Sequence, residues 1–129
     1  MPYSIEQRAD REILMFCGTL DVTNLSSTSI TTYWQFFVPK AMTITRLWAG
    51  YEAETGTGPA NIVTLRRGTV ALLSVNCTTA GTPVTDTAVD TGPLVTTAGE
   101  TLNIAFTDAN TDNDFVGLVV MVFGIPRTT

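Results

Sequence analysis

Histidine is absent from this chain of 129 residues. Its absence excludes Ser-His-Asp and Cys-His nucleophilic catalysis, the usual zinc sites and the commonest general base. No phosphate-binding glycine loop is present either. Glu52 and Glu54 have the spacing of a carboxylate pair on one face of a strand, but two exposed acids near a strand end are the simpler interpretation. We therefore expect neither an enzyme nor a bound cofactor.

Basic residues are few. Seven Lys and Arg residues stand against twelve Asp and Glu residues, the net charge is −5, and Lys40 is the one lysine. Binding to nucleic-acid phosphates requires clustered basic side chains. The only basic pair, Arg66-Arg67, is followed by Gly68 and is typical of a strand end. We expect no nucleic-acid partner.

Long apolar runs are also lacking. The longest, FVGLVVMVFG at residues 115–124, is about half of what a membrane-spanning helix needs. The N-terminal MPYSIEQRADRE has no apolar core of a signal peptide. We expect no membrane partner, and a chain that works in a cytoplasm or in a particle assembled there. Cys17 and Cys77 match no metal-binding spacing and are expected to be buried free thiols, although their pairing in space stays open.

What the chain does contain is β-strand patterning. Threonine is the commonest residue, with 24 copies, and β-branched residues favour strands. Eight apolar or alternating runs are separated by turn signals, which predicts an all-β, antiparallel jelly-roll or β-sandwich domain over residues 13–129. The expected strands are 13–22, 31–39, 41–54, 61–67, 69–76, 84–90, 100–106 and 115–125.

Two of these expected strands carry finer predictions. In residues 41–54 the apolar side chains stand at even positions up to Ile44 and at odd positions from Leu47 onward. This change predicts a β-bulge near Arg46. In residues 100–106 the alternation predicts that Leu102, Ile104 and Phe106 face inward, whereas Thr101 and Asn103 face outward.

The stretch TDANTDNDF at residues 107–115 places oxygen-bearing side chains at every second position. The candidate metal ligands are Asp108, Asn110, Asp112 and Asp114. An EF-hand loop counted from Asp108 requires glycine and glutamate where Asn113 and Val119 stand, so that template fails. Asp and Asn are also ordinary turn residues. We favour a plain turn or hairpin between the last two strands and expect no metal, with a weaker calcium loop as the alternative.

The last expected strand is apolar on both faces, and a two-layer sandwich covers only one of them. A second copy of the chain is the simplest cover for the other face. The predicted oligomer interface consists of Val116, Leu118, Val119, Met121 and Phe123. The alternative is that the N-terminal segment or a loop covers this face.

Residues 1–12 form a separate, polar segment with a weak capping-box pattern at Ser4 and Gln7. We expect an N-terminal arm that contacts a partner, and a frayed terminus is the alternative. The arm residues expected to make the contact are Tyr3, Ile5, Arg8 and Arg11.

Two stretches resemble parts of small jelly-roll proteins on viral particles. FFVPKAMTITRLWAGYEAE resembles their early strands. Residues 79–126, with AGETLNI before the Asp-rich turn and the long apolar strand, resemble their late strands. The nearest resemblance is to the head-decoration, or cement, proteins of tailed bacteriophages. It implies a non-enzymatic homotrimer that binds the major capsid protein on the outside of the virion, after assembly in the host cytoplasm. The partner of the N-terminal arm is then expected to be the capsid or an adjacent subunit.

A different function remains open from the residues alone. A receptor- or glycan-binding head of a phage fibre or spike would use the loop Asp108–Asp114, together with Tyr51, Glu52 and Glu54. Such heads usually follow a long shaft sequence, which this chain does not contain.

Overall fold

The computed structural model describes residues 12–22, 30–55, 61–77, 79–87, 90, 92–108 and 114–127. These residues form strands and no helix, which confirms the all-β prediction. The strands are β1 (Ile13–Val22), β2 (Ile30–Phe37), β3 (Met42–Gly50), β4 (Ala53–Thr55), β5 (Asn61–Arg67), β6 (Val70–Asn76), β7 (Val84–Asp86), β8 (Val95–Thr96), β9 (Thr101–Asp108) and β10 (Asp114–Pro126).

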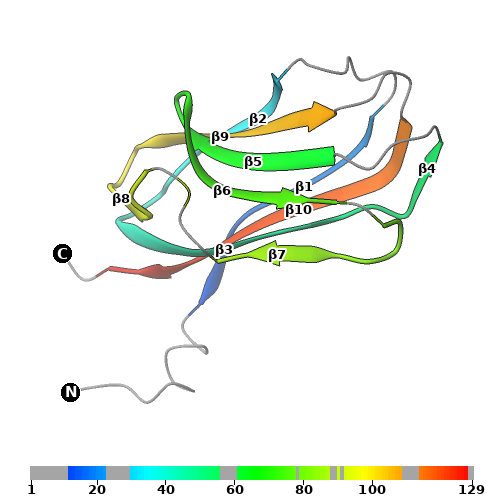
Figure 1. Ribbon diagram of the computed structural model, residues 1–129. Helices are drawn as coiled ribbons and strands as arrows, with labels where there is room; N and C mark the ends of the chain where they lie inside the picture. The colour runs from blue at the N-terminus through cyan, green and yellow to red at the C-terminus, as the bar shows by residue number, and fades with distance from the viewer. Residues whose placement is uncertain are drawn as a thin grey trace.

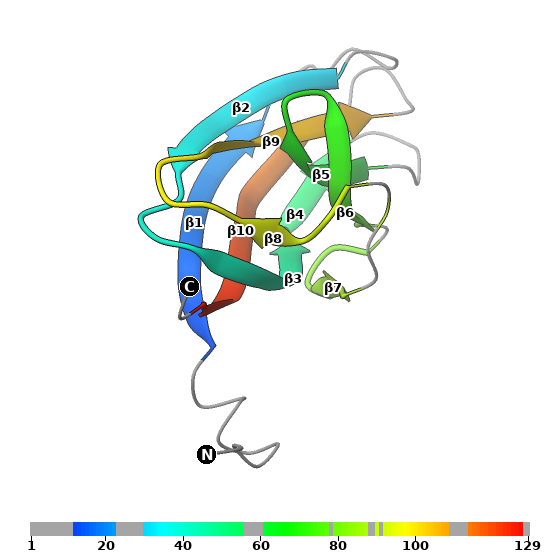
Figure 2. The same cartoon turned by 90° about the vertical axis from the view of Figure 1, so that its left-hand side faces the viewer.

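The strands form two antiparallel sheets that pack face to face as a β-sandwich (Figures 1 and 2). Sheet A has the order β1-β10-β3-β7, with β4 paired to β10 and β8 paired to β3. Sheet B has the order β2-β9-β5-β6. Because β9 belongs to sheet B and β10 to sheet A, the Asp-rich connection crosses between the sheets. The prediction of a hairpin at this point is therefore wrong, and the prediction of a connection between the last two strands is confirmed.

The core lies between the inner faces of the two sheets. Its largest fully buried side chains are Phe106, Met42, Ile44, Leu47, Leu65, Leu72, Leu73, Leu102, Ile104, Leu118 and Val38. Met42, Ile44 and Leu47 face it from β3, and Leu102, Ile104 and Phe106 face it from β9, as predicted. This apolar burial is the main contribution that holds the two layers together.

The predicted β-bulge lies at Thr45. Phe123 pairs with Arg46 and the next residue of β10, Gly124, pairs with Ile44, so Thr45 has no partner across the ladder. Because Thr45 is an extra residue in the strand, Leu47 faces the core although it stands three residues after the inward-facing Ile44. Beyond the bulge, Trp48 lies on the opposite face of sheet A from the core.

Two details of the strand predictions are wrong, and one outward-facing residue is more buried than usual. The expected strand 41–54 is interrupted at Tyr51 and Glu52, and its end forms the separate strand β4. The expected strand 84–90 is shorter, because β7 ends at Asp86. Asn103 alternates with Leu102 and Ile104 and faces away from the core, as predicted, yet only 7% of its surface is exposed. It lies on β9, between β2 and β5, and its side chain bonds Arg66 Nε and the carbonyl oxygen of Gly68.

Candidate interaction surface on the outer face of sheet A

The last strand, β10, separates its apolar side chains between two faces. Leu118, Val120 and Val122 are fully buried in the core. Val119, Met121 and Phe123 alternate with them and are half-buried on the outer face of sheet A. Of the predicted interface residues, Leu118 is therefore assigned wrongly, because strand alternation turns it inward. The side chain of Val116 lies outside the described part of the chain.

The neighbouring strands extend this outer face into a continuous apolar surface. Directly paired residues on adjacent antiparallel strands point to the same side of a sheet. Met121 is paired with Cys17 of β1 on one side and with Trp48 of β3 on the other. Phe123 is paired in the same way with Leu14 and Arg46. We call the following six residues the apolar strip: Leu14, Cys17, Trp48, Val119, Met121 and Phe123.

The strip is closed at one end by a polar cluster around Arg46. The guanidinium carbon of Arg46 lies 3.9 Å from the centroid of the Phe123 ring. Arg46 donates from Nε to Glu12 Oε1 at 2.9 Å, and Thr45 Oγ1 donates to Glu12 Oε2 at 2.5 Å. Glu12, the last residue of the predicted arm, is thus held against the outer face of sheet A. Tyr3, Ile5, Arg8 and Arg11, the predicted contact residues of the arm, lie outside the described residues.

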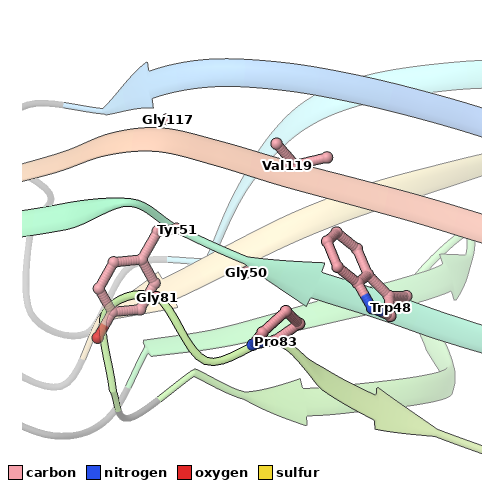
Figure 3. A pocket seen from close by; sticks show the side chains of 7 residues that line it. All are labelled: Trp48, Gly50, Tyr51, Gly81, Pro83, Gly117 and Val119. Atoms are coloured by element: carbon pink, nitrogen blue, oxygen red, sulfur yellow. The ribbon is translucent and has the colours of Figure 1, made fainter.

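The other end of the strip is hollowed into a pocket of about 170 Å³. Figure 3 shows its lining, which comes from β3 and the residue that follows it, from β10 and from the loop before β7. The lining residues are Trp48, Gly50, Tyr51, Gly81, Pro83, Gly117 and Val119. Because the seven residues come from three separate parts of the sequence, no local sequence motif predicts the pocket.

Glycines shape this pocket. A methyl group on Gly50 would lie 3.3 Å from Pro83 Cα, so the absent side chain lets the loop lie close to β3. The loop is also held by the Gly81 N–H, which donates to the carbonyl oxygen of Tyr51 at 2.8 Å. Gly117 has a φ of 68°, a left-handed conformation that favours glycine. A methyl group there would lie 3.2 Å from Glu52 Oε2, which places the Glu52 carboxylate beside the pocket.

Of the residues of the alternative binding site, Tyr51 lines this pocket and Glu52 lies beside it, next to Gly117. Tyr51 is largely buried, with 3% of its surface exposed, whereas Glu52 is exposed. Glu54 pairs with Phe115 through the β4–β10 ladder, and its side chain is outside the described residues. The predicted carboxylate pair of Glu52 and Glu54 is interrupted in its strand, because β4 begins only at Ala53.

The candidate calcium ligands fall mostly outside the described structure. Asp108 ends β9 and Asp114 begins β10, while Asn110 and Asp112 belong to the residues that are not described. Within the described ranges no group of three potential metal-ligating side chains occurs. The preference for a turn over a calcium loop stays a prediction.

The two cysteines are free thiols in different environments. Cys17 is exposed and Cys77 is buried. Burial raises the pKa of the Cys77 thiol to about 11. The expectation of free thiols is confirmed, but Cys17 was expected to be buried. It is exposed because it lies on the outer face of β1, an edge strand of sheet A.

Comparison of the chain with protein-family models and with curated proteins found no match. In the described part of the chain, no helix is long and apolar enough to span a membrane.

Proposed function

We propose that this protein is a structural component of a virion, a decoration or cement protein that binds the outer capsid lattice as a homo-oligomer and stabilises the head. A trimer is the expected assembly, the major capsid protein is the expected partner, and assembly in the host cytoplasm precedes its place on the capsid surface. The strand order β1-β10-β3-β7 against β2-β9-β5-β6 supports a jelly roll with two Greek keys for this role.

The apolar strip is the observation that carries the proposal. A sandwich of two sheets buries its inner faces, and an outer face of this kind gains stability when another surface covers it. Aromatic residues and methionine are enriched in the buried centres of protein interfaces. The strip offers Trp48, Met121 and Phe123 side by side. A second copy of the same chain presents an equally apolar surface, which supports self-association through the strip.

The arm fits the same function. Glu12 is fixed at the end of the strip by Arg46, so the chain that precedes it starts beside the proposed interface. A tethered segment of about ten residues adds affinity for a neighbouring surface through a high effective concentration. We propose that residues 1–11 contact the capsid or an adjacent subunit.

The test is co-sedimentation with capsids of the encoding virus that have been prepared without this protein. The full-length chain is expected to bind saturably, at a fixed ratio to the capsid subunits. A variant that lacks residues 2–11 is expected to bind at least about tenfold more weakly, because the tethered contact is lost. The double variant Arg8→Gln/Arg11→Gln removes two positive charges of the arm and keeps its apolar residues. Its binding therefore measures the contribution of the charges alone.

The two parts of the proposal fail separately. Full-length protein that does not sediment with capsids contradicts the decoration function. A deletion variant that binds as tightly as the full-length chain contradicts the role of the arm alone. The alternative of a glycan-binding head is tested by titration of the protein with methyl glucoside.

A further inference from the structure

The pocket at the end of the apolar strip has walls suited to an extended hydrocarbon chain. Trp48, Pro83 and Val119 supply an indole, a pyrrolidine ring and an aliphatic side chain. Gly50 lets Pro83 lie close to β3, and Gly117 leaves room for the side chain of Glu52. Trp48 pairs with Met121 and Gly50 pairs with Val119, so the lining follows the two paired strands β3 and β10.

The charge at the far end of the pocket is negative. The Glu52 carboxylate lies beside Gly117, and the residues lining the pocket include no lysine or arginine. The whole chain carries a net charge of −5. An anionic ligand would therefore meet repulsion here, whereas a cation at the Glu52 end would be attracted. A sugar would find few polar partners, because the lining side chains are almost entirely apolar.

We infer that this pocket receives an arginine side chain presented by a protein partner. The methylene stem lies along Trp48, Pro83 and Val119, and the guanidinium group meets the Glu52 carboxylate. Arginine fits both requirements, because its stem covers apolar surface while its planar head pairs with carboxylates and stacks on aromatic rings. All lining residues come from one chain, so the inference does not depend on binding to a capsid. Trp48 and Val119 also belong to the apolar strip, so a second copy that covers the strip would compete with the arginine.

The experiment is a titration of the full-length protein, followed by the indole N–H signal of Trp48 in ¹⁵N–¹H NMR spectra. Trp34→Phe assigns the two indole signals, since the chain has two tryptophans. The probes are N-acetyl-arginine amide, N-acetyl-citrulline amide, which has the same shape without the charge, and methyl glucoside. All titrations are made at one ionic strength. Leu14→Glu, at the opposite end of the strip, supplies a chain in which a second copy does not compete for this face.

We expect saturable shifts of the Trp48 signal with the arginine probe, and binding of the citrulline probe about threefold to tenfold weaker. Glu52→Gln is expected to remove this difference, because it keeps the size of the side chain and removes the charge. Asp90→Asn also removes one carboxylate, but Asp90 accepts a hydrogen bond from Ser74 Oγ and does not lie beside Gly117, so this variant is expected to keep the difference. The difference should shrink as salt is raised.

Three results overturn the inference. The first is an arginine probe that causes no saturable shift in Leu14→Glu. The second is equal binding of arginine and citrulline probes, which would show a purely apolar site. The third is tighter binding of methyl glucoside than of the arginine probe, which would assign the pocket to sugars and favour the glycan-binding head. None of these results bears on co-sedimentation with capsids, so the two proposals fail independently.

Discussion

Arg67 and Glu100 form a polar cluster that connects the two sheets. Arg67 ends β5 in sheet B, and its guanidinium donates to the carbonyl oxygens of Pro93 and Val95 at 3.0 and 2.8 Å. Its Nε also donates to the Glu100 carboxylate, which in addition accepts from the Thr97 N–H at 3.1 Å. Since Val95 belongs to β8 in sheet A, this cluster connects the two sheets.

Glu100 gives the protein a pH-dependent contribution to stability. Burial alone would raise the pKa of Glu100, but the hydrogen bonds from Arg67 and Thr97 and the charge of Arg67 lower it on balance from its ordinary 4.5. Because this pKa is lower in the folded than in the unfolded chain, the contribution is present above pH 4.5 and is lost as pH falls below it.

We expect Glu100→Gln to lower the free energy of unfolding by about 1 kcal/mol at pH 7, because a charge-assisted bond of a partly exposed pair is lost. Between pH 5 and about pH 3 the wild type should lose more stability than the variant. Urea denaturation at each pH measures both. Asp90→Asn, which removes a carboxylate outside this cluster, serves as the control. Parallel pH profiles for wild type and Glu100→Gln would contradict the assignment.

At the scale of the elements, the bulge in β3 decides which residues enter the core. On the N-terminal side of Thr45, Met42 and Ile44 face inward, and on the C-terminal side Leu47 and Ala49 do so. Without an extra residue, one of these pairs would point outward, because side chains alternate along a strand. The change of the apolar side chains from even to odd positions predicted the bulge within one residue, because a bulge changes the alternation pattern locally in the sequence.

Deletion of Thr45 should therefore prevent stable folding. Either Met42 and Ile44 or Leu47 and Ala49 would leave the core, and the transfer of large apolar side chains to water costs about 1.5–3 kcal/mol each. Thr45→Ala keeps the bulge and removes only the bond to Glu12, so a loss of about 1 kcal/mol is expected. Urea denaturation followed by near-UV circular dichroism measures both. A deletion variant as stable as Thr45→Ala would show that the bulge can be removed without moving the core residues.

At the scale of the whole molecule, the two faces of sheet A have different roles. The inner face completes the core with sheet B. The outer face carries the apolar strip, bounded by the Glu12–Arg46 pair at one end and by the pocket at the other. Cys17 lies within the strip and is exposed, whereas Cys77 is buried. The reactivity of Cys17 therefore reports whether another surface covers the strip.

Light scattering is expected to give a mass of three chains of 13.9 kDa, about 42 kDa, with and without calcium. In this assembly Cys17 should react slowly with a thiol reagent. Leu14→Glu should yield a monomer with a rapidly reacting Cys17, because a charge then lies within the interface. Val95→Glu is the matched control, since Val95 is 47% exposed and Leu14 is 49% exposed, but Val95 lies outside the strip.

A monomeric wild type whose Cys17 reacts as rapidly as that of Leu14→Glu would contradict self-association through the strip. A monomer with a slowly reacting Cys17 would instead support cover of this face from within the same chain.

The sequence by itself determined the β-sandwich, the inward residues of β3 and β9, the bulge and the apolar character of both faces of β10. These properties depend on alternation and on turn residues, which are local in the sequence. Only the tertiary structure decided which face of β10 was buried, and so moved Leu118 from the predicted interface into the core. It also assembled the pocket and buried Asn103, since Trp48, Pro83 and Val119, like Asn103 and Arg66, become neighbours only through pairing of distant strands.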